Sequence, residues 1–271
     1  MPGLTGPIIA PAQLPADRRT KPPSPETDRQ SSIMNTTILD RHLRHTLPRG
    51  RVKRTHPAGC PAVALYLFDP EVLDGPLSHD EARAVQAEPA YWSFCWASGQ
   101  VLGQYLLDNP ALVAGRRVID VGCGSGVVAI AAALAGAREV VACDIDEAAL
   151  AATAANAALN GVDLSLCGDW SARSGDFDVV IAADVLYDRD NLTLLDDFRA
   201  AAGTVLLADS RIRDLANDHY RLQTVISGRT WPDLDEFEEF NQVRIYRAAR
   251  VDDGLSAPAP DPVAQRTGSP P

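Results

Sequence analysis

The fold is decided by residues 118–126, which read VIDVGCGSG. The apolar, β-branched run is typical of a buried strand, and the Gly-x-Gly-x-Gly turn after it opens a helix. Glycines in such a turn allow positive φ and bring backbone N–H groups close to a ligand, while the helix N-terminus favours an anion. The stretch therefore predicts a nucleotide-type cofactor loop, although glycine turns also serve tight strand–helix packing.

Around this turn, β-branched runs alternate with Ala-rich helical runs over residues 116–208. The expected strands are Arg117–Val121, Glu139–Asp144, Val162–Cys167, Phe177–Asp184 and Thr204–Asp209, and the expected helices are Val127–Ala135, Glu147–Asn160 and Asn191–Ala201. Right-handed crossovers between such units predict an α/β fold with a doubly wound, mostly parallel sheet. A short helix near Ile212–Tyr220 and two further strands, Leu222–Ser227 and Gln242–Tyr246, predict seven strands with an antiparallel last strand.

Proline separates both ends of the chain from the middle. Seven of the twenty prolines precede Ser31 and five follow Leu255. This composition is typical of disordered tails. We predict a disordered basic and Pro-rich segment at 1–56, an N-terminal cap and lead-in helix at 57–110, the core at 111–250, and a disordered Pro-rich tail at 251–271.

The small cap has its own signals. Residues 62–68 are an expected strand, and Ser78 with Glu81 forms a capping box that opens an expected helix near Ser78–Gln86. In the lead-in helix the apolar residues recur at helical spacing, and Asn109-Pro110 ends it. The basic run 41–54 is expected to be a solvated arm, with an Arg-rich transit peptide as the alternative.

Composition excludes several classes of function. The 271 residues are 46% hydrophobic and 23% charged, which suits one globular domain. Residues 57–271 carry 15 Lys and Arg against 32 Asp and Glu, so nucleic acid is not an expected partner. No apolar run reaches membrane-spanning length and no secretory signal opens the chain, so no membrane partner is expected. The five cysteines include no CxxC pair, and we expect no metal.

Two carboxylates indicate which cofactor the loop binds. Asp144 closes the second strand 22 residues after Gly122, where a carboxylate accepts both ribose hydroxyls. The third glycine comes one position earlier than in a dinucleotide fingerprint. Asp120 stands inside the first strand, where it meets an ammonium group directly or through water. S-adenosylmethionine has that ammonium group and a ribose but no pyrophosphate, so it is the expected cofactor.

The third strand is followed by Asp169 and Trp170. Asp169 is a candidate acceptor for the adenine amino group, and Trp170 is a candidate to lie on the adenine ring. The alternative is an Asp turn with a surface tryptophan.

With these motifs the sequence resembles the class I, seven-strand, Rossmann-like S-adenosylmethionine-dependent methyltransferases. Residues 91–100 (YWSFCWASGQ), 105–110 (YLLDNP) and 184–188 (DVLYD) further resemble the lysine methyltransferases of the electron-transfer flavoprotein β-subunit. The resemblance implies cofactor contacts from Trp96, Gly122, Gly124, Gly126 and Asp144, with Asp184 and Tyr187 facing the methyl group and the incoming amine. Residues 209–211 (DSR) depart from the Asp-Pro-Gly-Arg-like turn of the relatives.

The resemblance implies a protein-lysine N-methyltransferase that acts on the electron-transfer flavoprotein β-subunit or a ribosomal protein. Two alternatives stay open: a small-molecule N-methyltransferase of a nicotinamide-like amine, and a non-catalytic cofactor-binding scaffold. Sparse lysine against abundant arginine and alanine indicates a GC-rich bacterial genome, so we expect the bacterial cytoplasm, with the mitochondrial matrix as the eukaryotic alternative.

The expected chemistry contains a conflict at Asp184. A lysine amine has a pKa of about 10.4, and holding it neutral near pH 7.4 costs about 4 kcal/mol. A carboxylate keeps the ammonium charged, whereas desolvation by aromatic neighbours favours the neutral amine. We expect Asp184 to orient the amine, Tyr187 to shape the pocket, and the proton to leave to water. In the structural alternative Asp184 caps the next helix and Tyr187 lies in the core. Tyr91 and Trp92 are candidates for the substrate entrance, and the alternative for Trp92 and Phe94 is ordinary core at a helix entry.

Overall fold

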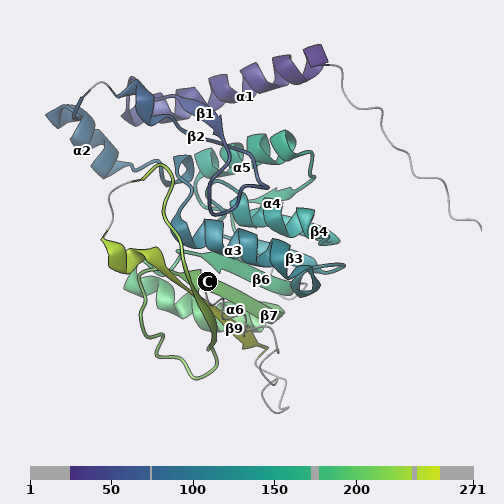
Figure 1. Cartoon of the computed structure of the whole chain (residues 1–271). Coiled ribbons are helices and arrows are strands. Elements are labelled where there is room, and N and C mark those ends of the chain that lie inside the picture. Colours follow the sequence, from purple (N-terminus) through teal and green to yellow (C-terminus); the bar gives the residue numbers. More distant parts are fainter. Residues whose placement is uncertain (1–24, 74, 172–176, 234–236, 251–271) are drawn as a thin grey trace, which may run out of the picture.

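The computed structural model describes residues 25–73, 75–171, 177–233 and 237–250, and its centre is a seven-stranded sheet with helices on both faces (Figure 1). From edge to edge the strands are β5 (Ser165–Cys167), β4 (Glu139–Cys143), β3 (Arg117–Val121), β6 (Phe177–Ala183), β7 (Ala202–Asp209), β9 (Gln242–Ala249) and β8 (Arg221–Ser227). Strand β9 is antiparallel to both of its neighbours, and the other adjacent strands pair in parallel. The predicted α/β sheet with an antiparallel last strand is confirmed.

Strand β3 alternates between two hydrophobic layers because successive side chains of a strand point to opposite faces. Val118 belongs to the cluster under α3 (Ala97–Asp108) and α4 (Val127–Leu134), whereas Ile119 belongs to the cluster under α6 (Leu194–Ala201). Helix α5 (Glu147–Asn160) packs beside α4. The sheet is thus buried on both faces, which explains why its central strands are continuous apolar runs.

The order of the strands reverses beside β3. From β3 the chain proceeds through β4 to the edge strand β5, and it then returns to β6 on the other side of β3. In doubly wound sheets a ligand binds at such a switch point, outside the carboxyl ends of the strands. The loops after β3, β4 and β6 are therefore the place to look for a site.

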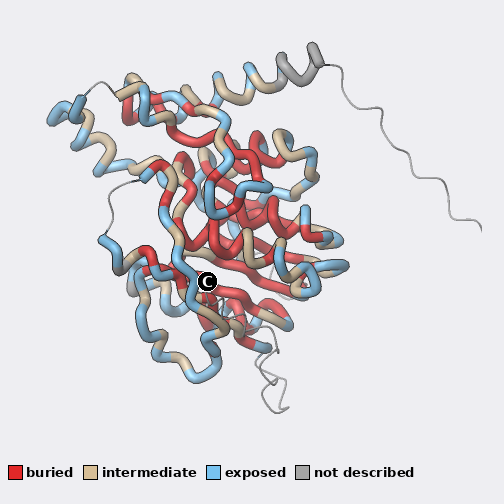
Figure 2. The backbone as a smooth tube through the Cα atoms, viewed as in Figure 1, coloured by how far each residue is buried: buried red, intermediate tan, exposed pale blue. Residues whose placement is uncertain are grey.

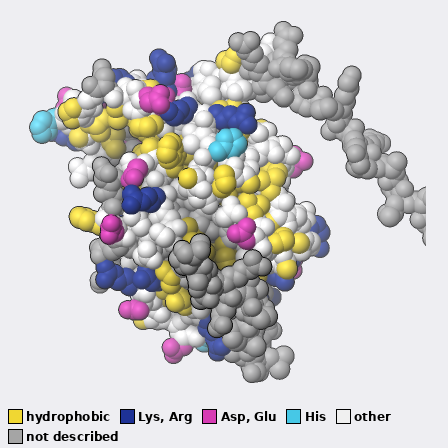
Figure 3. Space-filling model, viewed as in Figure 1, with side chains coloured by type: hydrophobic (Ala, Val, Ile, Leu, Met, Phe, Trp, Pro, Cys, Tyr) yellow, Lys and Arg dark blue, Asp and Glu magenta, His cyan; other side chains and the backbone are white. Residues whose placement is uncertain are grey.

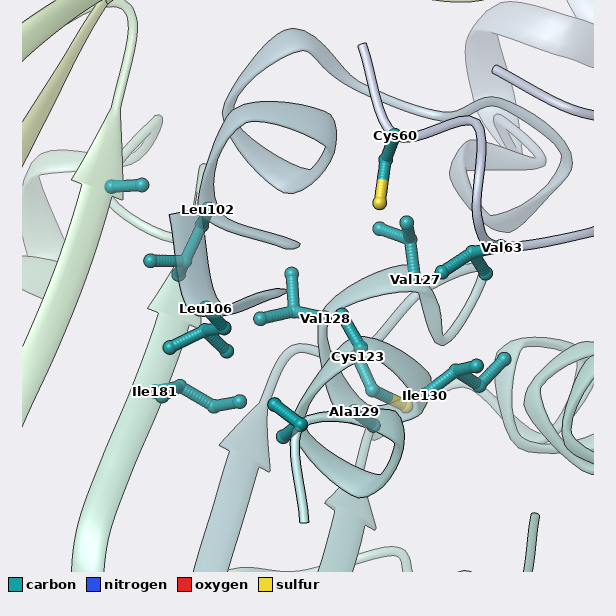
Figure 4. Packing of buried hydrophobic residues seen from close by; sticks show 14 of the residues in the cluster. Cys60, Val63, Leu102, Leu106, Cys123, Val127, Val128, Ala129, Ile130 and Ile181 are labelled. Atoms are coloured by element: carbon teal, nitrogen blue, oxygen red, sulfur yellow. The ribbon is translucent and has the colours of Figure 1, made fainter. Parts of the chain in front are cut away.

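The first core cluster fills the space between α3, α4 and the sheet. Figure 4 shows Leu102 and Leu106 of α3 facing Val128 of α4, with Ile181 of β6 beneath them. The glycine-loop residue Cys123 and the cap residue Cys60 join the same cluster. The loop is thus anchored in a close-packed interior rather than in a surface turn.

The N-terminal segment corrects one prediction. Residues 1–56 are expected to be disordered, but Pro25–Thr46 form helix α1 and Val52–Thr55 form strand β1. Leu39, Leu43 and Leu47 are buried against α5, so the basic run 41–54 belongs to the end of a packed helix and to strand β1 rather than to a solvated arm. Figure 2 shows this pattern, with an inner buried side and an outer exposed side on the helix. Residues 1–24 and 251–271 lie outside the described residues.

The rest of the cap follows the sequence closely. Strand β1 pairs with β2 (Leu65–Phe68), and the short 3-10 helices η1 (Pro70–Val72) and η2 (Tyr91–Ser93) flank helix α2 (His79–Ala87). The predicted capping box of α2 is present. Trp92 is buried in the cap interior, so its candidacy for the substrate entrance is wrong.

The remaining elements are turns and short helices. The lead-in helix α3 ends at Asn109 before the 3-10 helix η3 (Pro110–Leu112), and η5 (Arg189–Thr193) and η6 (Glu238–Asn241) precede α6 and β9. The helix expected near Ile212–Tyr220 is not formed. The Asp209 carboxylate instead accepts the Arg211 and Ile212 amides, a side-chain bond that competes with helical pairing. Within the described residues, no helix is both long and apolar enough to cross a membrane.

Candidate active site

The glycine loop connects β3 to α4 at the switch point. Gly122, Gly124 and Gly126 have φ of +74°, +52° and +80°, values that residues with a side chain adopt only with strain. The Gly122 and Cys123 amides donate to the Cys143 carbonyl at 2.9 and 3.0 Å, which ties the loop to the end of β4.

The space around each glycine shows whether packing requires a glycine there or whether a ligand can approach it. A Cβ atom at Gly122 would stand 2.7 Å from Val185 Cγ1, and one at Gly126 would stand 2.9 Å from the Thr153 side chain. A Cβ atom at Gly124 would meet nothing within 4 Å. Packing therefore requires Gly122 and Gly126, whereas Gly124 borders open space, as a loop that holds a cofactor must.

Asp144 lies just beyond β4 and reaches back over the loop. Its Oδ2 accepts the Gly124 amide at 2.9 Å, and its Oδ1 accepts the Asp146 amide at 3.0 Å. Partial burial raises the pKa of this half-buried carboxyl. Both oxygens have lone pairs left for hydroxyl donors, so the expected ribose contact is compatible with the geometry.

Ile145 is a site candidate that the sequence reasoning missed. Its side chain is 93% exposed although it lies between Asp144 and Asp146 at the carboxyl edge of the sheet. A bare apolar side chain beside the predicted ribose acceptor suits a flat, weakly polar ring such as adenine. The signal was available in the sequence as an isoleucine between two aspartates in ACDID.

Asp120 was expected to meet the ammonium group of the cofactor directly or through water, but it lies in the interior behind the loop. The residue is 1% exposed, and its Oδ2 accepts the Ala129 amide of α4 at 3.0 Å. Burial raises the pKa of Asp120 to about 7. The carboxyl thus caps the first turn of α4, and of the two predicted routes to an ammonium group, the one through water suits this position.

Asp169 forms the Asp turn that the sequence left open as the alternative, whereas Trp170 is half-buried and is not the surface tryptophan of that alternative. Asp169 Oδ1 accepts the Ser171 amide at 2.9 Å and its hydroxyl at 2.6 Å, which is an Asp turn. The Trp170 ring is half-buried and packs against Phe198 of α6, with ring centroids 5.3 Å apart. The turn accounts for the conformation at Asp169, and the contact of either residue with adenine stays a prediction.

Asp184 follows β6 and is held on several sides. Its Oδ1 accepts the Ser98 hydroxyl at 2.6 Å, the Ser210 hydroxyl at 3.1 Å and the Ser210 amide at 3.4 Å. Its Oδ2 accepts the Ser98 amide at 3.3 Å. Burial, with a smaller effect of Asp209, raises the pKa of Asp184 to about 6 although the serine bonds lower it. Among the described residues it is the one non-glycine residue with positive φ, +53°.

Three aromatic side chains form a wall beside Asp184, here called the aromatic wall: Tyr91, Trp96 and Tyr187. The Tyr91 ring centroid lies 5.8 Å from that of Trp96 and 6.2 Å from that of Tyr187. The Trp96 indole donates to the Tyr91 carbonyl at 3.1 Å, which fixes its ring. Tyr91 and Tyr187 are 52% and 64% exposed, so the wall opens to solvent and Tyr187 is not a core residue.

The structure brings the cofactor side and the substrate side together. Val185, next to Asp184, lies against Gly122. Tyr187 is near enough to both Asp144 and Tyr91 for their charges to raise its pKa, after the larger effect of burial. Ser98 and Ser210 were missed, because only folding brings them to Asp184. No cluster of three metal-ligating side chains exists within the part of the chain that the structure describes.

Comparison with known proteins finds similarity to two kinds of methyltransferase. Residues 102–193 match the family model "Ribosomal protein L11 methyltransferase (PrmA)". The chain is 39% identical over 127 residues to the rat electron transfer flavoprotein beta subunit lysine methyltransferase, with 44% of this chain and 50% of the relative covered. It is 37% identical over 134 residues to the ribosomal protein L11 methyltransferase of Syntrophotalea carbinolica, with 46% and 42% covered.

Among solved structures, the ribosomal protein L11 methylase of Lactobacillus delbrueckii subsp. bulgaricus matches with a TM-score of 0.44 and 25% identity, over 56% of this chain and 78% of that one. The chain spans about half the length of the rat relative. Its sheet order and glycine loop are those of a doubly wound, Rossmann-like α/β fold, and residues 102–193 are similar to a methyltransferase family model. The matched parts of the chain are similar to the lysine methyltransferases of the electron transfer flavoprotein beta subunit and to the L11 methyltransferases.

Proposed function

We propose that this chain is an S-adenosylmethionine-dependent protein-lysine N-methyltransferase. The observation that carries the proposal is that two features lie together at the carboxyl edge of the sheet. One is the open space over Gly124, and the other is the Asp184 carboxylate beside an exposed aromatic wall. A cofactor held by the loop then has its reactive end next to a carboxylate that can receive an amine.

The cofactor contacts are assigned residue by residue. Gly122, Gly124 and Gly126 wrap the methionine part, Asp144 accepts the ribose hydroxyls, and Ile145 covers the adenine ring. Trp96 stands beside the methyl group, Asp120 meets the ammonium group through water, and Asp169 remains an acceptor for the adenine amino group. Trp170 stays a candidate to lie on the adenine ring, because its ring is only half-buried where it packs on Phe198.

S-adenosylmethionine supplies an activated methyl group on a sulfonium, so this chain has to place an amine lone pair in line with it. Asp184 captures and orients the amine, and Tyr187 with Tyr91 shapes the entrance and removes water from it. No nucleophilic side chain is required. The proton leaves to water before transfer.

The proposed partner is a protein that carries the target lysine, either the electron transfer flavoprotein β-subunit or a ribosomal protein. Similarity to relatives of both kinds supports these two candidates. We place the activity in the bacterial cytoplasm, with the mitochondrial matrix as the alternative for a eukaryotic source.

A small-molecule N-methyltransferase is the second candidate, and it requires an enclosed pocket. The exposure of Tyr91 and Tyr187 favours a protein substrate over an enclosed small molecule. On the face in Figure 3, charged side chains of both signs are interspersed, and hydrophobic side chains gather over the cap. The third candidate, a scaffold without turnover, predicts cofactor binding with no transfer.

The test is a labelling experiment. The purified protein is incubated with methyl-labelled S-adenosylmethionine and three samples: the electron transfer flavoprotein β-subunit, the ribosomal protein L11, and an extract from cells that lack the enzyme. Label on lysine in a protein supports the proposal. Label confined to small molecules establishes the second candidate, and no label despite measurable cofactor binding establishes the scaffold.

A matched pair of variants tests the role of Asp184. Asp184→Asn should leave cofactor affinity near normal and lower methyl transfer strongly, because the neutral amide no longer attracts an ammonium. Asp190→Asn changes an exposed carboxylate on the next turn and should leave both unchanged. Equal losses of binding and transfer in Asp184→Asn contradict the assignment.

A further inference from the structure

The two oxygens of Asp184 have unequal surroundings. Oδ1 accepts three donors, the Ser98 hydroxyl and both the hydroxyl and the amide of Ser210. Oδ2 accepts the Ser98 amide alone among the described residues, at 3.3 Å. A carboxylate oxygen has about two lone-pair sites. Oδ1 is therefore saturated, whereas Oδ2 keeps a vacant acceptor site.

We propose that Ser98 and Ser210 are positioning residues that fix Asp184 so that Oδ2 is the oxygen that receives the acceptor amine. This inference rests on the proposed function. It assigns a separate role to two serines that neither the glycine loop nor the aromatic wall requires.

The position of the two serines supports a dedicated role. Ser98 lies in the first turn of α3, Asp184 follows β6 and Ser210 follows β7, so three separate elements converge on one carboxylate. Ser98 is 0% and Ser210 6% exposed, so solvent does not compete for these bonds. Charge-assisted hydrogen bonds of 2.6 to 3.1 Å are among the stronger side-chain contacts.

The backbone conformation of Asp184 indicates that the surrounding contacts fix the orientation of its side chain. Its φ of +53° is a conformation that side chains adopt at some cost, and such strain persists where surrounding contacts over-determine it. The Asp184 amide also donates to the Ala208 carbonyl at 3.0 Å, which holds the residue against β7. The main chain and both serines thus determine together where Oδ2 points.

A structural alternative is that the serines merely fasten α3 to the sheet. The two readings differ in what a serine substitution does to Asp184 itself. Ser98→Ala removes the shortest donor to the ionised carboxyl, so the pKa of Asp184 should rise by about one unit. The titratable groups that face Asp184 are Asp209 at the end of β7 and the Cys95 thiol before α3. Both are left in place.

The experiment compares Ser98→Ala and Ser210→Ala with a matched control. Ser93→Ala also removes a fully buried hydroxyl, but that hydroxyl donates to the Ala90 carbonyl at 2.8 Å. Ser210→Thr keeps the hydroxyl and should restore most of what Ser210→Ala loses. Four quantities are measured: S-adenosylmethionine affinity, melting temperature, the pH profile of kcat/KM with the electron transfer flavoprotein β-subunit and L11 as substrates, and the titration of Asp184 by carboxyl-carbon NMR.

We expect Ser98→Ala to bind S-adenosylmethionine within about twofold of the wild type, to lose at least tenfold in kcat/KM, and to move the acidic limb of the pH profile upward by about one unit. The proposal is overturned if the kcat/KM of Ser98→Ala falls only in proportion to the folded fraction and the acidic limb of its pH profile does not move. An equal shift in Ser93→Ala also overturns it.

Failure of the proposed function is distinguishable from failure of this inference. A wild type that methylates neither of these proteins nor any protein of the cell extract overturns the proposed function and with it the assignment of the amine to Oδ2. Whether the serines hydrogen-bond to the Asp184 carboxylate is then tested by NMR titration of Asp184 without substrate. An unchanged Asp184 titration in Ser98→Ala overturns it, and an upward shift confirms it.

Discussion

Substitution of Gly124 by alanine separates cofactor binding from folding in the glycine loop. The new methyl group would point into space where no atom lies within 4 Å, so no clash is created. The Gly124 amide that donates to Asp144 is kept. The perturbation therefore reduces to two effects, the cost of a left-handed backbone and a methyl group in the space assigned to the cofactor.

The backbone effect can be calibrated within the same chain. A residue with a side chain pays about 1–2 kcal/mol in the left-handed region, which corresponds to a fall in melting temperature of roughly 2–8 °C for a domain of this size. Gly161, which ends α5 with φ of +65°, also has nothing within 4 Å of its Cβ position. Gly161→Ala is the matched control for strain without a ligand. Gly126→Ala adds a contact of 2.9 Å with Thr153 and should destabilise more.

The assay is calorimetric titration with S-adenosylmethionine, together with thermal unfolding without ligand. Gly124→Ala and Gly161→Ala should unfold at similar temperatures, but only Gly124→Ala should lose affinity, by at least about tenfold or 1.4 kcal/mol. The reasoning is refuted by Gly124→Ala binding the cofactor within twofold of the wild type, because the open space would then not be the cofactor site.

Three further predictions concern stability and pH. Burial raises the pKa of Asp120 to about 7, so the folded state holds a proton that the unfolded state releases, and stability should fall as pH rises from about 4 to about 7. Asp120→Asn keeps the acceptor for Ala129 and should reduce this fall in melting curves at pH 5 and pH 8; an equal fall contradicts it. Leu39→Ala in α1 should cost about 2–5 kcal/mol in urea unfolding, whereas the partly exposed Ile38→Ala costs much less. Because the proton leaves the amine before transfer, kcat/KM should rise about tenfold per unit between pH 7.5 and 9, and a flat profile would contradict this.

The sheet was predictable because its strands depend on local patterns. The β-branched runs, the alternation with Ala-rich helices and the glycine turn all occur within windows of a few residues. The parallel pairing of β3 with β4 and β6 agrees with these local patterns. Helix α1 was missed because its amphipathic signal is weak and proline-rich sequence precedes it. Its stability comes from packing of Leu39, Leu43 and Leu47 on α5, a tertiary effect that no local pattern reports.

The candidate site divides in the same way. Gly124, Asp144, Asp184 and Tyr187 were predicted, because each lies in a loop after a strand whose carboxyl end forms the crevice. Ser98 and Ser210 lie 86 and 26 residues from Asp184, and their hydroxyls meet it only in the folded chain. Trp92 was misplaced because an aromatic residue beside a motif fits either a core or a ligand surface until its neighbours are known.

The surroundings of Asp184 also resolve the conflict between holding an ammonium and releasing its proton. Its pKa of about 6 lies roughly four units below the pKa of a lysine amine, so proton transfer from the ammonium to this carboxylate is uphill by about 6 kcal/mol. The residue is therefore ill suited to be the base and well suited to orient. Three donors on Oδ1 draw charge away from the carboxylate, which weakens its hold on the ammonium, and the aromatic wall offers a bound amine an apolar side. Both effects favour the neutral amine. Asp184 can therefore orient the amine without strongly stabilising its protonated form.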